Sequence, residues 1–418
     1  MTLPRLLSGA EGTPMGLERH RDQHGDLPSS GSRLVEEIAA AGLRGRGGAA
    51  FPLSLKLDAV RRGRRTPVVI VNACEGEPMS TKDRLLLSSV PHLVLDGAIA
   101  VARAIGADEV LVAIDDLNPR AQDIVAWALT QRPEVRRGRL CVEVVAIPGG
   151  YVSGQESAIV QWLNQGVAKP TSPTPRVTER GIRRRPTLVS NAETLAHVAL
   201  IARRGARWFR EVGTHEDPGS ALVTISGAVE RPGVYEMSHG ATLGSLVTAA
   251  GGLSERSRAF LVGGYSGAWL DMSQARQARL SRAGLVPFSA RLGPGIVVAL
   301  PERSCAVAEA TRVAGWLADH SAGQCGPCVN GLAAIADALA AVCRGDGGPA
   351  GLAWIARWCD QVTGRGACAH PDGAAGFVSS ALSVFAEEFA DHAQHGPCEA
   401  CHASPILATP PTLALATH

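Results

Sequence analysis

The sequence has neither a strong net charge nor a long apolar run. Its 418 residues include 41 Lys and Arg against 39 Asp and Glu, which is a formal net charge of +2. So small a charge creates no field that would favour nucleic acid or an anionic membrane as the main partner. No run of about 18 apolar residues occurs, and the first ten residues lack the apolar stretch of a signal peptide. We therefore expect a cytoplasmic protein with no nucleic-acid ligand and no direct membrane insertion.

Ten cysteines are informative in such a compartment. Under reducing conditions cysteines rarely form structural disulfides, and more often they ligate metal or lie buried. Five stand alone and are predicted to be small buried hydrophobic side chains. These are Cys74, Cys141, Cys305, Cys343 and Cys359. Two pairs with Cys-x-x-Cys spacing differ from them, Cys325 with Cys328 and Cys398 with Cys401.

The first half of the chain alternates strand and helix signals. With 45% hydrophobic residues, the chain is long enough for roughly two to four domains. Within residues 30–210, short β-rich apolar runs lie at 67–72, 109–114 and 141–147, separated by helical stretches such as 93–105. This alternation predicts an α/β domain with a parallel sheet covered by helices.

The sequence pattern changes twice in the second half of the chain. Residues 217–300 contain short strand-like runs and a Pro-Gly turn, and they predict a small β-rich module. Residues 305–392 are rich in Ala and contain four helical segments, which predict a helical bundle. Residues 395–418 are rich in Pro, Ala and Thr, and we expect them to form a disordered tail.

Two segments of the first half have the composition of a cofactor site. The first is the glycine-rich run 42–52, followed by Lys56, in which glycines allow close approach to a flat ring or phosphate. The second follows the strand at 67–72 and contains Asn72, Glu75 and Glu77, which can bind sugar hydroxyls at the carboxyl end of a parallel sheet. Taken singly, each segment fits an ordinary solvated loop equally well.

Six motifs in order carry a family resemblance. They are Gly45-Arg-Gly-Gly-Ala-Ala-Phe-Pro52, Asn72-Ala-x-Glu-Gly-Glu-Pro78, Lys82-Asp-Arg84, Tyr151-Val-Ser-Gly-Gln-Glu-Ser-Ala158, Pro186-Thr-Leu-Val-Ser-Asn-Ala-Glu-Thr194 and Gly323-Gln-Cys-Gly-Pro-Cys328. From about residue 40 to residue 390, the chain resembles the NADH-binding flavoprotein (51 kDa, F-type) subunit of complex I, shared with soluble NAD-linked hydrogenases and formate dehydrogenases. The resemblance implies an FMN-binding parallel-sheet domain, an SLBB-type β-grasp module and a C-terminal four-helix bundle that holds an iron-sulfur cluster.

The resemblance also implies roles for single residues. Nine would lie along FMN: Gly45, Arg46, Gly47, Lys56, Asn72, Gly154, Glu156, Asn191 and Thr194. Phe51, Glu75 and Glu77 would meet NADH, and a carboxylate near the ribose would favour NADH over NADPH. The hydride transfer belongs to the cofactors, so no catalytic side chain is expected.

Several positions depart from the family pattern. Ala50 replaces a glycine, Cys74 replaces an Asp, Gln155 replaces the first of two adjacent glutamates, and Ser190 replaces an Asn. Each change alters the shape or charge of the flavin surroundings. Together they raise the alternative of a catalytically weakened structural or electron-relay subunit.

The sharpest departure concerns the cluster. Four thiolates are the usual ligands of a [4Fe-4S] cluster, but the first family position here is Ala322. Cys325, Cys328 and Cys368 remain as predicted metal ligands. Three thiolates can hold a [3Fe-4S] cluster, a [4Fe-4S] cluster with water, Ser321, His320 or a stray cysteine on the fourth iron, zinc, or nothing.

The pair Cys398 and Cys401 lies in the expected tail, with His395 and His402 beside it. It could bind zinc, act as a redox dithiol or supply a cluster ligand, and two incidental thiols in a flexible tail fit as well.

The leading functional expectation is an NADH dehydrogenase-type (diaphorase) oxidoreductase subunit that passes electrons through FMN and iron-sulfur chemistry to an external carrier. The carrier would be a ferredoxin-like or [2Fe-2S] protein, and other subunits of a redox complex are further candidate partners. The alternatives are the weakened relay subunit and a zinc-bound interaction module.

Overall fold

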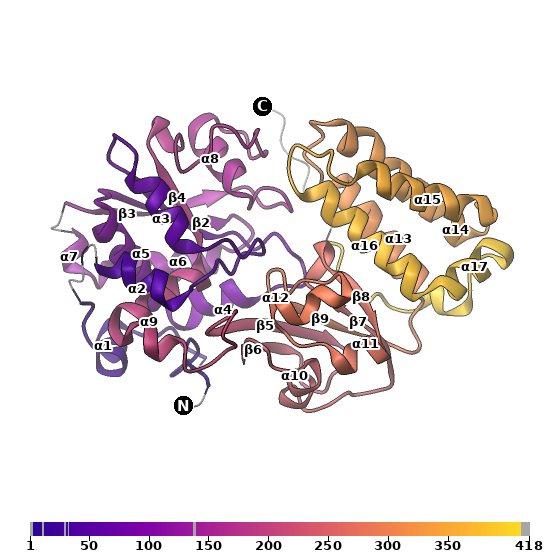
Figure 1. Ribbon diagram of the computed structural model, residues 1–418, viewed down its shortest axis with the longest axis horizontal. Helices are drawn as coiled ribbons and strands as arrows, with labels where there is room; N and C mark the ends of the chain where they lie inside the picture. The colour runs from indigo at the N-terminus through magenta and orange to yellow at the C-terminus, as the bar shows by residue number, and fades with distance from the viewer. Residues whose placement is uncertain (1–2, 11, 29–30, 32, 137–138, 411–418) are drawn as a thin grey trace.

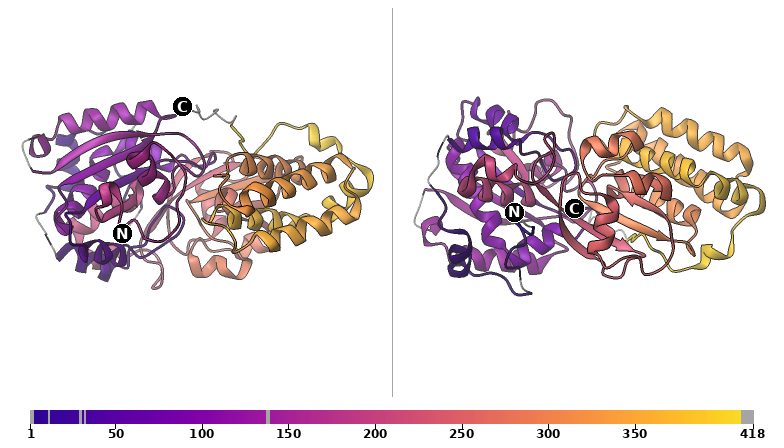
Figure 2. Two further views of the ribbon diagram at one scale, coloured as in Figure 1. Left: turned by 90° about the horizontal axis from the view of Figure 1, so that it is seen from above. Right: turned by 60° about the horizontal axis from the view of Figure 1, so that its bottom comes forward.

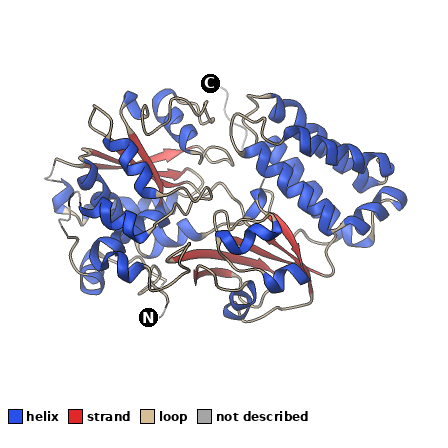
Figure 3. Cartoon of the chain, in the orientation of Figure 1, coloured by secondary structure: helices blue, strands red, loops and turns tan. Residues whose placement is uncertain are grey.

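The computed structural model describes residues 3–10, 12–28, 31, 33–136 and 139–410, and in them the chain folds into three parts in sequence order (Figure 1). In this view the α/β domain lies at the left, the mixed β-sheet module at the bottom centre and the helical bundle at the right. The helices and strands are separated by colour in Figure 3, where the two sheets are seen to be distinct.

The α/β domain is built on a four-stranded parallel sheet in the order β3-β2-β1-β4. Its elements are α1 (Leu17–His24), α2 (Arg33–Ala41), α3 (Leu53–Arg61), β1 (Val68–Ala73), α4 (Lys82–Ser89), α5 (Pro91–Ile105), β2 (Glu109–Asp115), α6 (Pro119–Thr130), α7 (Pro133–Arg136), β3 (Cys141–Ile147), α8 (Glu156–Gln165), η1 (Ile182–Arg184), β4 (Thr187–Asn191) and α9 (Ala192–Phe209). The expected strands at 67–72, 109–114 and 141–147 correspond to β1, β2 and β3. The sequence analysis did not identify β4.

Both faces of β1 and β2 are buried, as expected in a parallel sheet, whereas the edge strand β3 is partly exposed. Val69 and Val71 of β1 face a core that includes α2, α3, α5, α6 and α9. Val68 and Ile70, on the opposite face, pack with Ile159 of α8. The apolar β1 run therefore follows from burial on two sides and not from alternation.

The middle module is a five-stranded mixed sheet in the order β6-β5-β9-β7-β8, with β5 and β9 parallel and the other pairs antiparallel. Its elements are β5 (Ser220–Gly227), β6 (Gly233–Ser238), α10 (Leu243–Ala249), β7 (Ser257–Val262), η2 (Gly264–Ser266), β8 (Ala268–Asp271), α11 (Met272–Gln277), α12 (Arg282–Leu285), η3 (Val286–Phe288) and β9 (Ile296–Pro301). One face packs on α10 and α11, and the other face shares a core with the bundle.

The bundle contains α13 (Ala306–Asp319), the π-helical turn η4 (Pro327–Leu332), α14 (Ala333–Arg344), α15 (Gly348–Val362), α16 (His370–Val384), α17 (Ala386–His395) and the short η5 (Glu399–His402). The last of the four expected helical segments is divided between α16 and α17. Figure 2 shows α13 to α17 side by side, at the end of the molecule opposite the α/β domain.

The expected disordered tail at 395–418 is ordered as far as Pro410. Residues 403–410 run along α13, where Ile406 and Leu407 donate backbone N–H groups to Glu309 at 2.9 and 3.0 Å. The sequence analysis was wrong here because these short polar contacts leave no periodic signal. Residues 411–418 lie outside the described part of the chain.

One helical stretch in the described residues, Pro327–Arg344, has the length and mean hydropathy of a membrane span, and the bent pair α4 and α5 meets the same criteria only if it is taken as one span. By length and composition alone this is weak evidence, since core helices of soluble proteins share these properties. Here α14 packs against α13, α15 and α17.

Candidate functional site

The carboxyl ends of β1 and β4 bring two asparagines side by side. Asn72 and Asn191 are register partners at the last shared position of the two strands. The Asn191 side chain accepts the Glu193 N–H at 3.1 Å and so caps α9. The Asn72 amide donates to the Gly154 carbonyl at 2.8 Å. The pairing of β4 with β1 therefore joins the two predicted flavin segments that contain Asn72 and Asn191, and the sequence analysis did not identify β4.

The glycine-rich loop lies directly over this edge. The Arg46 N–H donates to the Thr194 hydroxyl at 2.8 Å, which ties the loop to the first turn of α9. A Cβ added at Gly47 would lie 3.3 Å from the Asn191 Cβ, so glycine permits the close approach. Because a Cβ at Gly154 would lie 3.3 Å from the Cys74 carbonyl oxygen, the facing loop is equally tight.

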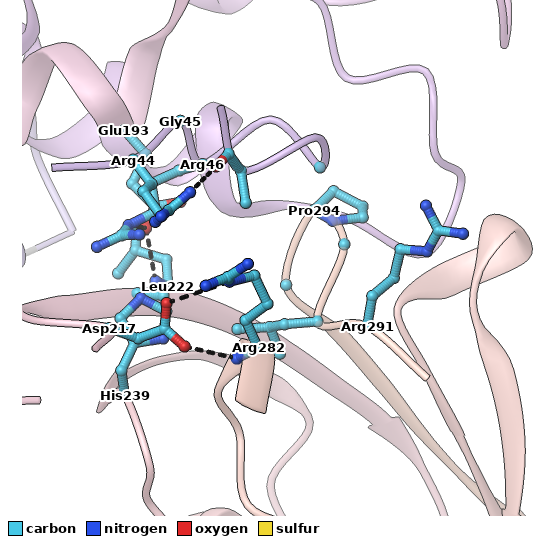
Figure 4. A pocket seen from close by; sticks show the side chains of 16 residues that line it. Arg44, Gly45, Arg46, Glu193, Asp217, Leu222, His239, Arg282, Arg291 and Pro294 are labelled. Atoms are coloured by element: carbon cyan, nitrogen blue, oxygen red, sulfur yellow. Dashed lines mark hydrogen bonds and ion pairs between the residues drawn. The ribbon is translucent and has the colours of Figure 1, made fainter. Parts of the chain in front are cut away.

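A pocket opens where this loop meets the β module (Figure 4). Arg44 and Arg46 line it from the loop, and Arg282 and Arg291 line it from the module. The Arg46 side chain is buried, and its Nε has no hydrogen-bond partner among the described residues. The pocket lining has four arginines against the two carboxylates of Glu193 and Asp217, and this excess of positive charge suits an anionic ligand group. The sequence analysis missed Arg282 and Arg291 because they lie in another domain.

Lys56 and Glu156 form a half-buried ion pair on the other side of the loop. The Lys56 ammonium lies 2.6 Å from the Glu156 carboxylate and also donates to the Val189 carbonyl of β4 at 2.9 Å. The pair joins α3, α8 and β4. Lys56 and Glu156, predicted from separate motifs, are therefore neighbours.

A buried ion network lies next to Asn191. The Lys82 ammonium lies 2.9 Å from Glu193, 3.1 Å from Asp83 and 3.2 Å from the Asn191 side-chain oxygen. Although burial opposes the charged form, the carboxylates of Asp83 and Glu193 raise the pKa of Lys82 above its usual value. Lys82 therefore remains a cation and holds Asn191 in place.

Glu75 caps a helix. Its carboxylate accepts the Ser80 hydroxyl at 2.6 Å and the backbone N–H groups of Asp83 and Arg84 at 3.0 and 3.2 Å, at the start of α4. A carboxylate has about four acceptor positions, so roughly one remains for a ligand hydroxyl.

Glu77 lies at the junction of all three parts. Its carboxylate accepts the Tyr151 hydroxyl at 2.9 Å and the backbone N–H of Tyr265 at 3.1 Å. The Tyr151 ring in turn packs edge-on against Trp316 and His370 of the bundle. The Glu77 carboxylate thus has hydrogen-bond partners within the chain. Phe51, the third residue expected to meet NADH, is 44% exposed.

Glu77 should make stability depend on pH. Burial raises the pKa of Glu77 to about 7, against the opposing effect of hydrogen bonds from Tyr265 and Tyr151. A folded pKa above the unfolded value means that the folded state binds more protons, so stability is full below about pH 4.5 and falls as the pH rises through about 7. The loss should reach at most about 3 kcal/mol. Urea unfolding at pH 5 to 8 should show this slope in the native chain and in the exposed control Glu179→Gln, and a smaller slope in Glu77→Gln, because Glu75 and Glu236 also have raised pKa values. An equal slope in all three would contradict the assignment.

Ala50 adopts a backbone conformation that favours glycine. Its φ is 49°, in the left-handed region, at the position where the resemblance implies glycine. Ala50→Gly should raise the free energy of unfolding by up to about 1 kcal/mol, since a non-glycine residue in this region costs about 1–2 kcal/mol and glycine costs some chain entropy. Urea unfolding checks the prediction. The matched control is Ala49→Gly at the exposed neighbour, which should be neutral or destabilising, and equal effects in both variants would contradict strain at Ala50.

Of the three remaining cluster cysteines, Cys325 lies in the loop between α13 and η4, Cys328 lies in η4, and Cys368 lies just before α16. Cys328 lies near Cys325 and Cys368, and the Ser321 hydroxyl bonds to it. Ala322, at the lost cysteine position, is buried. A π-helical turn, a feature frequent at functional sites, begins at Pro327. Three thiols and a hydroxyl are a donor set that suits iron or zinc.

One loop connects the two candidate sites. Gly154 contacts Asn72, as described above, while the next residue, Gln155, places its side-chain amide 3.8 Å from the Cys368 sulfur. Adjacent residues of this loop therefore contact a predicted flavin residue and a predicted cluster cysteine.

Comparisons with known proteins agree with these three parts. Residues 38–200 match the Nuo51 FMN-binding domain, residues 222–266 the SLBB domain, and residues 308–392 the NADH-ubiquinone oxidoreductase-F iron-sulfur binding region. The second NADH-quinone oxidoreductase F subunit of Rhizobium meliloti is 32% identical over 380 residues, which cover 87% of this chain and 90% of the relative. The corresponding F subunit of Streptomyces coelicolor is 30% identical over 370 residues, covering 86% and 82%.

A solved structure extends the likeness to the fold. The crystal structure of an NAD+-reducing [NiFe]-hydrogenase in the H2-reduced state superposes with a TM-score of 0.82 at 30% identity, over 94% of this chain and 67% of that chain. The predicted family and fold class are thereby confirmed. With an FMN-binding domain, an SLBB module and an iron-sulfur binding region in order, the chain belongs to the family of NADH-quinone oxidoreductase F subunits, which are NADH dehydrogenase-type flavoproteins.

Proposed function

We propose that this chain oxidises NADH at FMN and delivers the electrons, through a cluster held by Cys325, Cys328 and Cys368, to an external ferredoxin-like or [2Fe-2S] carrier. When bound, FMN accepts the hydride of NADH and the cluster supplies one-electron transfer. The chain itself binds, orients and insulates these groups. The protein would act in the cytoplasm, where its free thiols stay reduced.

Nine residues are proposed to hold FMN: Gly45, Arg46, Gly47, Lys56, Asn72, Gly154, Glu156, Asn191 and Thr194. Their mutual contacts support the proposal, because these bonds bring the segments together at one edge of the sheet, the glycines allow close approach, and Gly45 and Arg46 line the pocket. The cationic lining beside Arg46 suits a phosphate.

Phe51, Glu75 and Glu77 are proposed to face NADH, each with a different degree of support. The exposed Phe51 ring is free to stack on a planar group. Glu75 keeps about one acceptor position for a ribose hydroxyl, and its charge would repel a 2′-phosphate. Glu77 has less capacity left, since Tyr151 and Tyr265 already occupy its oxygens. We therefore expect Glu77 to act mainly by positioning its neighbours.

The observation that carries the proposal is the adjacency of Gly154 and Gln155. One residue contacts the flavin segment, and the next lies 3.8 Å from the Cys368 sulfur. A single short loop therefore lies between the two candidate centres and could set the distance for electron transfer.

The carrier is proposed to be a separate protein. The named relatives are subunits of larger redox enzymes, which supports additional protein partners here.

Anaerobically reconstituted full-length protein tests the function. NADH should bleach the flavin absorbance and then reduce an added ferredoxin, and NADPH should do so much more slowly. Flavin that stays oxidised after NADH addition would reject NADH oxidation. Rapid bleaching without ferredoxin reduction would reject only that acceptor.

The left-handed Ala50 and the loss of a carboxylate at Cys74 favour a second candidate, a relay or structural subunit with little NADH turnover. In that case FMN or iron would be present, yet NADH would leave the flavin oxidised. The same experiment separates the two.

A further inference from the structure

Three cysteines and a histidine converge away from the candidate cluster site. Cys305 caps α13, His392 lies in the last turn of α17, Cys398 precedes the first residue of η5, and Cys401 lies within η5. Their ligand atoms all lie within 4.8 Å of one another. Cys305 was predicted to be an isolated buried thiol, and His392 was not singled out, so the sequence analysis missed half of this group.

The spacing matches a tetrahedral metal site. Cys305 Sγ lies 3.5 Å from both His392 Nε2 and Cys401 Sγ. Cys401 Sγ lies 3.8 Å from Cys398 Sγ and 3.9 Å from His392 Nε2. In a tetrahedral zinc site with bonds of about 2.3 Å to sulfur and about 2.0–2.1 Å to nitrogen, the edges are about 3.8 Å and about 3.6 Å. The four side chains are therefore arranged as ligands of one ion, since thiolates on separate irons of a cluster would lie farther apart.

Two contacts orient these ligands. His392 Nδ1 lies 3.4 Å from the Cys343 carbonyl oxygen, which can only accept, so Nδ1 carries the proton and Nε2 has a free lone pair. The Ala308 N–H, in the first turn of α13, donates to Cys305 Sγ at 3.2 Å and so fixes the position of this sulfur. Metal-binding histidines commonly show such a second hydrogen bond.

We propose that Cys305, His392, Cys398 and Cys401 bind one zinc ion with a structural role. Four protein ligands leave no open position, and Cys305 and His392 are 2% and 0% exposed. On binding, three thiols release three protons, and three thiolates with a neutral imidazole surround Zn²⁺. No oxidation or reduction is involved.

This site is separate from the candidate cluster. Cys305 precedes the first residue of α13, whereas the Ser321 to Cys328 loop follows its last residue. A helix of 14 residues spans about 21 Å at 1.5 Å per residue. The pair Cys398 and Cys401 therefore cannot complete the cluster ligands at Ala322.

The ion would anchor the end of the chain across the domain junction. Residues 403–410, here called the C-terminal strap, leave the site and run along α13. Leu407 O accepts from Arg312, Ala408 O accepts from the Tyr265 hydroxyl of the β module, and the Ala408 N–H reaches the Met79 sulfur of the α/β domain at 3.3 Å. Zinc would thus fasten a strap that touches all three parts.

Metal analysis of the purified full-length protein tests the proposal. The native chain and Cys141→Ser, which alters an exposed thiol on β3, should each contain about one zinc per chain in this four-ligand site. Cys401→Ser should lose that zinc while its FMN and iron contents stay at the native level. Zinc retained in Cys401→Ser, or lost in Cys325→Ser instead, would overturn the proposal.

A second measurement guards against misfolding of the variant. Native protein depleted of zinc and titrated with Co²⁺ should develop intense tetrahedral ligand-field bands and thiolate charge-transfer absorption, saturating at about one equivalent. Absence of these bands, or a Cys398–Cys401 disulfide in protein purified under reducing conditions, would also overturn it. Neither readout depends on NADH oxidation, so failure of the proposed function would leave this test intact.

Discussion

Cys368→Ala should lower the rate of electron delivery from NADH to a ferredoxin by at least about 100-fold, which corresponds to about 2.7 kcal/mol in activation free energy. Flavin bleaching by NADH should continue in the same variant. The physical reason is that Cys368 lies with Cys325 and Cys328 at the candidate cluster site, while the contacts around Asn72 and Asn191 do not involve it. Stopped-flow absorbance follows both steps separately.

The control for this prediction is Cys141→Ser, which changes an exposed thiol on β3. It should transfer electrons at the native rate. If Cys368→Ala also kept the native rate, electrons would leave the flavin without the cluster, and the proposed route would be rejected.

The position of the lost cysteine allows the reverse experiment, in which a ligand is added. Ala322 is buried beside Ser321, whose hydroxyl bonds to Cys328. Ala322→Cys should restore a four-thiolate ligand set and convert any oxidised-state three-iron EPR signal into a reduced-state [4Fe-4S] signal. Loss of all iron signals in both proteins would reject an iron cluster at these residues.

Lys82→Met should lower the free energy of unfolding by about 3–5 kcal/mol, since removal of one partner from a buried ion network leaves uncompensated charge. Lys82 is 1% exposed and lies 2.9 Å from Glu193 and 3.1 Å from Asp83. The same change should also weaken FMN binding, because Lys82 contacts the Asn191 side chain. Urea unfolding and flavin titration measure the two effects.

An exposed ion pair provides the comparison. Arg256 lies 3.1 Å from Glu302, with side chains 87% and 57% exposed, and Arg256→Met should change stability by no more than about 1 kcal/mol. Adding Glu193→Gln to Lys82→Met should recover part of the loss, since one unpaired charge is removed and the acceptor for the Leu222 N–H is kept. If the double variant recovers no stability, the loss in Lys82→Met comes from lost packing and not from an unpaired charge.

Much of the fold was predictable because its signals are local. The apolar runs of β1 and β2 reflect burial on two faces, and the glycine-rich loop reflects close backbone approach at Gly47. β4 was missed because only five residues form it, after an arginine-rich stretch. That omission concealed the pairing of Asn72 with Asn191.

The candidate site was only partly predictable, for a related reason. Glu75 and Glu77 look alike in sequence, two positions apart in one motif. In the structure Glu75 caps α4, whereas Glu77 meets Tyr151 and Tyr265 at the domain junction. Which hydrogen-bond donors a carboxylate meets depends on tertiary packing, which the spacing of residues in the motif does not reveal.

The sequence by itself determined the family, the three textures of the chain and the loss of the first cluster cysteine at Ala322, because ordered motifs and ligand spacings are written in neighbouring residues. Only the tertiary structure decided that Cys305 joins His392, 87 residues later, and that the two join Cys398 and Cys401 at tetrahedral spacing. A metal site needs ligand atoms within a few ångströms in space. Helix packing in the bundle, not sequence proximity, brings these four together.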